Sequence, residues 1–170
     1  MQNFLSHICG RPDIITTSDL LHNETYSYQM KDQIEIDVIE SRIRNINDSI
    51  DEIEKILEKE FAEQTQTSLY ALRYLLIQLV ESSAGICIHL MKKCFREKPT
   101  GYPDCFVRLS KKGIFPEDLG QKLASAGRLR NVLVHRYWTI DDTLVYNSTK
   151  DGISDFRAYI EHIIEFIWVE

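Results

Sequence analysis

The stretch KDQIEIDVIESRIRNINDSIDEIEKILEKEFAE, residues 31–63, has the clearest periodicity in the chain. Its aliphatic side chains recur at intervals of three and four residues, which places them on one face of a long helix whose other faces are charged. This stripe consists of Ile36, Ile39, Ile43, Ile46, Ile50, Ile53 and Leu57. Either a coiled coil between two chains or a bundle within one chain would bury it. Because several other segments are also apolar, we expect a bundle.

A second long helix is predicted over residues 68–95, where apolar residues cover a wide face. Such a helix belongs at the centre of a bundle, in contact with several neighbours. Glu81 interrupts the apolar run, and a carboxylate buried there would need a partner. Prolines and glycine at 99–103 mark a loop, after which a short helix is expected over 103–112.

Pro116 opens the next predicted helix, because proline is favoured at a first turn and two acidic residues follow it. We expect this helix to end near Tyr137 and a connector to occupy residues 138–152. Ser154 is then a suitable N-cap for the last helix. The sequence therefore predicts an all-α, up-and-down bundle of four main helices plus a short one.

A chain of 170 residues with 44% hydrophobic content is expected to form one folded domain. Residues 1–30 lack convincing periodicity, so we expect them to be a partly ordered N-terminal extension to a helical domain over 31–170. The four cysteines, Cys9, Cys87, Cys94 and Cys105, show no metal-site spacing, and we expect no metal. Cys87 and Cys94 are expected to be buried free thiols.

No apolar run approaches 18 residues and the N-terminus lacks a signal-peptide layout, so the expected location is cytoplasmic, with no membrane span. The net charge of −6 is unfavourable for a nucleic-acid binder, although local potential matters more than the total. Basic residues do gather in one region, at Lys122, Arg128, Arg130 and Arg136. A nucleic-acid substrate is therefore not excluded.

The segment RNVLVHRYW, residues 130–138, holds the residues best suited to chemistry. Arg130 is a permanently charged fork that matches phosphate geometry, and His135 can take and give a proton near neutral pH. Asn131 and His135 are four residues apart and share a helix face. Arg130 lies about 140° around the helix from His135. Either the helix distorts, or two copies of the segment meet across the two-fold axis of a homodimer.

This segment resembles the signature of the HepT toxins, a branch of the HEPN superfamily of all-α ribonucleases. The family pattern is Arg, four residues, His, one residue, Tyr, and it fits at Arg130, His135 and Tyr137 without a gap. The resemblance continues through LRYLLIQLVESSAGICIHLM (72–91) and covers roughly residues 31–170. It implies a HEPN-like fold, a homodimer with a composite site, and Glu81 facing either the dimer partner or the motif.

The reaction that the resemblance implies is cleavage of single-stranded RNA without a metal ion or cofactor. His135 would act as general base on the ribose 2′-hydroxyl, and Arg130 would stabilise charge on the phosphoryl oxygens. Asn131 would orient the histidine or the phosphate. Arg128 and Arg136 are either surface charges or contacts to the RNA backbone.

Tyr137 has a separate implied role, as acceptor of AMP transferred by a partner, the MntA-type minimal nucleotidyltransferase antitoxin. Two other interpretations stay open. One is a non-catalytic nucleotide-binding module of a nucleotidyltransferase complex. The other is a purely structural helical dimer, which would be favoured if Arg130 and His135 were buried in internal ion pairs.

Overall fold

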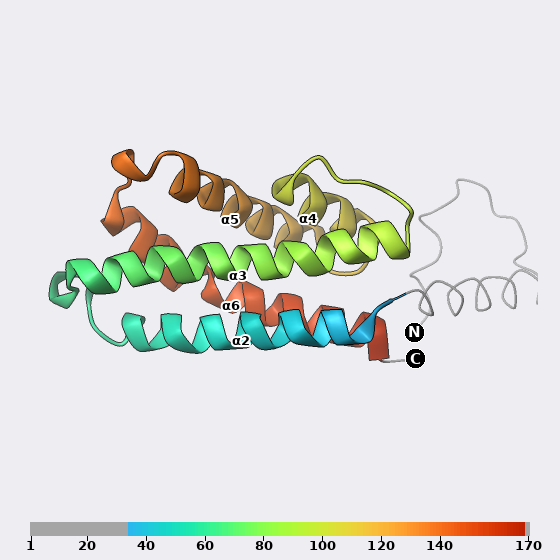
Figure 1. The fold of residues 1–170 in the computed structure, drawn as a ribbon, viewed down its shortest axis with the longest axis horizontal. Helices are drawn as coiled ribbons and strands as arrows, with labels where there is room; N and C mark the ends of the chain where they lie inside the picture. The colour runs from blue at the N-terminus through green and yellow to red at the C-terminus, as the bar shows by residue number, and fades with distance from the viewer. Residues whose placement is uncertain (1–33, 169–170) are drawn as a thin grey trace, which may run out of the picture.

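The computed structural model describes residues 34–168, and this part of the chain is all-α (Figure 1). Its helices are α2 (Ile36–Leu57), α3 (Gln66–Lys93), α4 (Tyr102–Lys111), α5 (Glu117–His135) and α6 (Asp142–Trp168), with single 3₁₀ turns at Phe61–Glu63 and Tyr137–Thr139. The four long helices run up and down, and the short α4 packs against α5. The predicted fold is confirmed for these residues. The predicted extension over 1–30 lies outside them.

Helix α2 is buried within the bundle, as the isoleucine stripe predicts. Ile39, Ile46, Ile50 and Ile53 are fully enclosed, and α2 packs against α3 and α6 of the same chain. The helix ends at Leu57, earlier than the predicted 63. The side chain of Gln64 explains the stop, because its amide donates to the carbonyls of Ile56 and Lys59 at 2.7 Å each.

Helix α3 is the central helix and contacts each of the other long helices as well as α4. It begins at a capping box in which Thr65 and Ser68 exchange hydrogen bonds. By length and composition alone, α3 could cross a membrane. Its buried leucines instead pack against neighbouring helices, which is typical of the core helix of a bundle.

The last helix begins at Asp142, so the predicted connector over 138–152 and the N-cap at Ser154 are wrong. Asp141 is the actual cap: its carboxylate accepts the backbone N–H groups of Thr143 and Leu144 at 2.9 and 3.2 Å. Val145 and Thr149, four residues apart, are buried on one face of the extra turns. The acidic pair at 141–142 therefore marks a helix start rather than a turn.

The side chains of Cys87, Cys94 and Cys105 are buried, as predicted for the first two. Burial raises the pKa of the Cys94 thiol to about 11. Within residues 34–168, no group of three or more His, Cys, Asp or Glu side chains is placed to hold a metal ion.

Candidate functional site

Helix α5 carries the motif, residues 130–137, and it remains a regular helix through His135. The N–H of Arg136 still donates to the carbonyl of Val132 at 2.8 Å, but the backbone of Arg136 leaves the helical region. The helix thus ends two residues before the predicted Tyr137. A distorted helix was one of the two ways of aiming Arg130 and His135 at the same phosphate. Because α5 is regular between these two residues, that way is excluded within a single chain.

Arg130 points into the bundle, toward α3, and its side chain is only 17% exposed. Its Nε donates to Glu81 Oε1 at 3.1 Å, and its Nη2 donates to the same oxygen. Nη1 lies 3.5 Å from Asn131 Oδ1. The guanidinium is therefore charge-balanced and held along one edge. Glu81 is 42% exposed, so the predicted need of a buried carboxylate for a partner does not arise, but its contact with Arg130 does place it facing the motif.

Tyr102, the first residue of α4, covers the guanidinium of Arg130, with the Arg130 Cζ 5.2 Å from the ring centroid. Two glycines of α5 let α4 come this close. A Cβ added at Gly127 would lie 3.3 Å from Pro103, and one at Gly120 would lie 2.4 Å from Ser110 Oγ. The sequence reasoning missed Tyr102, because nothing in its local pattern links it to a residue 28 positions later.

His135 and Asn131 are exposed in the last turns of α5. The side chain of His135 makes no hydrogen bond or ion pair with any other residue that the structure describes. The structure therefore does not bring Arg130 and His135 together: one side chain faces α3 and α4, the other faces solvent. A purely structural role would be favoured if Arg130 and His135 were both buried in internal ion pairs. Arg130 meets this condition and His135 does not. Tyr137 lies in the 3₁₀ turn that follows α5.

The basic cluster near the motif is smaller than its sequence suggests. Lys122 donates to Asp155 of α6 at 2.9 Å, and this carboxylate raises the pKa of Lys122 above its ordinary value. Arg128 is exposed and donates to Ser125 Oγ at 2.8 Å, and Arg136 is exposed after the end of α5. Among the four basic residues, Lys122 and Arg130 are paired with carboxylates, and Arg128 and Arg136 have no ion pair with the residues that the structure describes.

Large apolar side chains are exposed around the end of the bundle that carries the motif. Val132 and Val134 belong to α5, Trp138 follows it, and Leu144 lies in the first turns of α6; their exposed fractions are 40%, 36%, 69% and 62%. Nearby, Arg73 of α3 donates to Asp142 at 2.7 Å and ties α3 to the start of α6. An ion pair thus links α3 to α6 at this end of the bundle, where apolar side chains close to His135 in the sequence are exposed.

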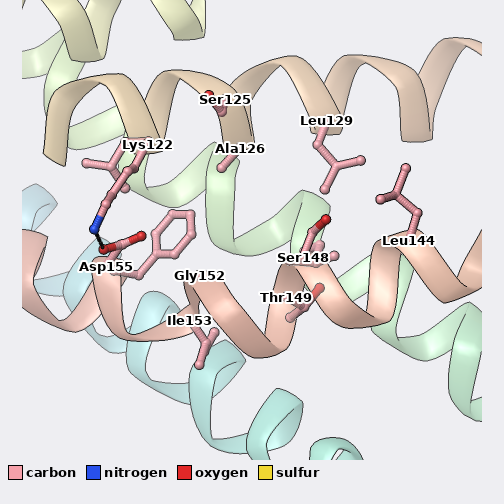
Figure 2. Close-up of a pocket in the computed structure, with 13 residues that line it drawn as sticks. Lys122, Ser125, Ala126, Leu129, Leu144, Ser148, Thr149, Gly152, Ile153 and Asp155 are labelled. Carbon is pink, nitrogen blue, oxygen red and sulfur yellow. Dashed lines mark hydrogen bonds and ion pairs between the residues drawn. The ribbon is translucent and has the colours of Figure 1, made fainter. Parts of the chain in front are cut away.

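A cavity of about 250 Å³ lies between α5 and α6 (Figure 2). Apolar side chains line most of it, among them Leu76, Leu129, Leu144 and Phe156, and the Lys122–Asp155 ion pair closes one end. Neither Arg130 nor His135 lines it. This cavity is therefore separate from the residues that are suited to phosphate chemistry.

Comparison with known proteins points to one family. The family model described as "Ribonuclease HepT-like" matches residues 46–163. A "tRNA nuclease HepT" from Aphanizomenon flos-aquae is 27% identical over 138 residues, covering 79% of this chain and 92% of the relative. A tri-AMPylated HEPN toxin from Shewanella oneidensis, solved in complex with an MNT antitoxin, superposes with a TM-score of 0.69 at 23% identity, covering 75% of this chain and 96% of that one.

The fold is also shared by a solved protein without an assigned function. The cytosolic protein YutE from Bacillus subtilis superposes with a TM-score of 0.66 at 18% identity, covering 81% of this chain and 96% of its own length. At such identities the structural likeness establishes the HEPN-like fold, while function has to be argued from the residues.

Proposed function

The chain belongs to the HepT-like ribonuclease family, and we propose that it is the toxin of a toxin–antitoxin pair that cuts single-stranded RNA without a metal ion. The observation that carries the proposal is that the C-terminal part of α5 holds both an arginine fixed by Glu81 and a histidine exposed to solvent, on different sides of the helix. The curated relative named as a tRNA nuclease supports the same class of reaction. We place the protein in the cytoplasm, where such RNA is found.

In this mechanism His135 takes the proton from a ribose 2′-hydroxyl. The resulting oxygen attacks the adjacent phosphorus, the bond to the 5′-oxygen breaks, and that oxygen takes up a proton. Arg130 stabilises the negative charge that grows on the phosphoryl oxygens, and Asn131 orients the histidine or the phosphate. The products are a 2′,3′-cyclic phosphate and a 5′-hydroxyl. DNA resists because it lacks the attacking hydroxyl.

We propose that the working site is shared between two copies of the chain. Arg130 and His135 lie about 140° apart around a regular helix, so one copy cannot aim both at one phosphate. A two-fold axis near the motif would place the Arg130 of one copy opposite the His135 of the other. The exposed apolar side chains beside His135 provide surface for this contact. Arg128 and Arg136 would then contact the RNA backbone at the rim of the cleft.

Tyr137 is proposed as the position at which activity is switched off, by transfer of AMP from an MntA-type nucleotidyltransferase antitoxin. The AMPylated Shewanella toxin in complex with its MNT antitoxin supports such a partner. A phosphodiester-linked AMP two residues from His135 adds bulk and negative charge, which would repel an RNA phosphate. Residues 1–30 remain a predicted extension to the helical domain.

The test is cleavage of a defined RNA in EDTA by the wild type, by His135→Ala, and by wild type treated with the nucleotidyltransferase and ATP. We expect the wild type to give cyclic-phosphate ends, His135→Ala to be inactive, and the treated protein to gain AMP on Tyr137 and lose activity. Tyr137→Phe, which cannot be modified there, is the control. A wild type that binds nucleotides and cuts no RNA would favour the non-catalytic module.

A further inference from the structure

We propose that Glu81, together with Tyr102, is a positioning residue that fixes the guanidinium of Arg130 before RNA binds. The inference rests on the proposed ribonuclease function and adds two residues to it from outside the motif. Glu81 lies on the central helix α3 and Tyr102 opens α4, so three helices meet at Arg130. None of these contacts depends on a second copy of the chain.

The pattern of donors supports positioning. One oxygen of Glu81 accepts from both Nε and Nη2 of Arg130, which lie on the same edge of the fork. This arrangement stops rotation of the guanidinium about its side-chain axis. The opposite edge, formed by Nη1 and the second hydrogen of Nη2, keeps the geometry that matches two oxygens of a phosphate. Nη1 is also within 3.5 Å of Asn131 Oδ1, the other polar residue of the motif.

Tyr102 restrains the guanidinium in the remaining direction. The Arg130 Cζ lies over its ring, 5.2 Å from the centroid, so the ring attracts the cation and limits its movement toward α4. The edge formed by Nη1 and Nη2, where the long 3.5 Å hydrogen bond to Asn131 is the other contact, is the part of the fork left to meet a phosphate. The close packing of Pro103 on Gly127 holds α4, and with it the ring, against α5.

The physical consequence falls on the rate of the chemical step. An arginine that is already ordered does not lose rotamer freedom when the transition state forms, so its full charge acts on the growing oxyanion. Glu81 also balances part of the positive charge of Arg130, so it does not strengthen attraction of RNA. Removing the carboxylate should therefore lower kcat, while KM stays the same or falls.

The test compares Glu81→Ala, Glu81→Gln, Tyr102→Leu and Tyr102→Phe in cleavage of one defined RNA, with kcat and KM measured separately. We expect kcat to fall about 30-fold in Glu81→Ala and about 5-fold in Glu81→Gln, which keeps an acceptor oxygen, because a small misplacement of a catalytic group is costly. Tyr102→Leu should lose about 5-fold, and Tyr102→Phe, which keeps the ring face, should stay within about twofold.

The matched control is Glu54→Gln, whose carboxylate is about as exposed as that of Glu81 (46% and 42%). It weakens an ion pair between α2 and Arg157 of α6 without touching α4 or α5. It should leave kcat unchanged. A second measurement follows the Nε–H signal of Arg130 by ¹⁵N NMR, identified by its loss in Arg130→Lys. We expect slow hydrogen exchange at this position in the wild type and in Glu54→Gln, and fast exchange in Glu81→Ala.

The outcomes separate this inference from the proposed function. If the wild type cuts RNA and Glu81→Ala cuts it equally fast, the positioning role is overturned and the ribonuclease proposal stands. The same holds if Glu81→Ala raises KM without changing kcat. If the wild type cuts no RNA, or if His135→Ala cuts every RNA that the wild type cuts, the ribonuclease proposal fails. The catalytic role of Glu81 then fails with it, even where the Arg130 signal reports an intact ion pair.

Discussion

The two sides of the end of α5 are built differently. On one side, Arg130 is largely enclosed and contacts Glu81 and Tyr102. On the other side, His135 is exposed, and the side chains near it are apolar and also exposed. A single chain therefore completes the environment of the arginine and leaves that of the histidine open. The difference indicates that folding alone fixes the side chain for which we propose phosphate binding, while the side chain proposed for proton transfer stays open to whatever contacts this surface.

The largest expected effect comes from removing either of these two residues. His135→Ala and Arg130→Ala should each lower cleavage by about 10²- to 10⁴-fold, since a proton acceptor or a charge stabiliser of the transition state is lost. Their stabilities should differ. Thermal unfolding should show a lower Tm for Arg130→Ala, which leaves Glu81 without its partner, and an unchanged Tm for His135→Ala. Equal losses of Tm would contradict the asymmetry between the two sides.

Mixing the two inactive variants tests whether the open side is completed by a second copy. A mixed dimer of Arg130→Ala and His135→Ala keeps one intact Arg130 facing one intact His135 across the axis. An equal mixture refolded together should regain about one quarter of wild-type activity, because half of the dimers are mixed and each restores one of two pairings. The unmixed variants are the control. No recovery, with mixed dimers verified by mass, would mean that both residues act from the same chain.

The enclosed side should be sensitive to the packing of α4 on α5. Gly120→Ala puts a Cβ 2.4 Å from Ser110 Oγ, so the helices must separate. We expect a loss of about 1–3 kcal/mol in the free energy of unfolding, measured by urea denaturation. Gly152→Ala in α6 is the matched control, because the nearest atom to its new Cβ is 4.0 Å away. It should raise stability by up to about 1 kcal/mol, as alanine is favoured over glycine inside a helix.

The smallest expected effect concerns pH and the attachment of α4. A hydrogen bond from Lys112 lowers the pKa of Glu97 below its ordinary value of 4.5, with Arg108 of α4 contributing further. This stabilisation is present above the ordinary pKa and is lost as the pH falls through the lowered, folded-state value. Thermal unfolding between pH 6 and about pH 3 should show a shallower loss of Tm in Glu97→Gln than in wild type. Parallel curves would mean that the pair adds nothing.

The sequence predicted the parts of the fold that local periodicity controls. The isoleucine stripe of α2 and the apolar α3 are found where they were expected, because their patterns repeat over many turns. The first turns of α6 were missed because Asp141 and Asp142 are as suitable for a turn as for a helix start. Only tertiary burial of Val145 and Thr149 decides between the two, and this contact is not local.

The candidate site was predictable to the same extent. The spacing of Arg130, Asn131 and His135 predicted which side chains share a helix face, and a regular α5 bears this out. The position of Glu81 within an apolar run indicated that its carboxylate would need a partner if it were buried, but the sequence did not identify Arg130 as that partner. The sequence contained no signal for the contact between Tyr102 and Arg130, because this contact depends on how α4 packs on the glycines of α5.

The up-and-down course of the four long helices has a practical consequence for handling the protein. The start of α2 and the end of α6 both lie at one end of the bundle, and the turn after α5 lies at the opposite end (Figure 1). A dye, tag or solid support attached at the exposed end of α6 is therefore held at the end of the bundle opposite to His135. Surface-based binding measurements with RNA or a protein partner can use such an attachment with the motif directed outward.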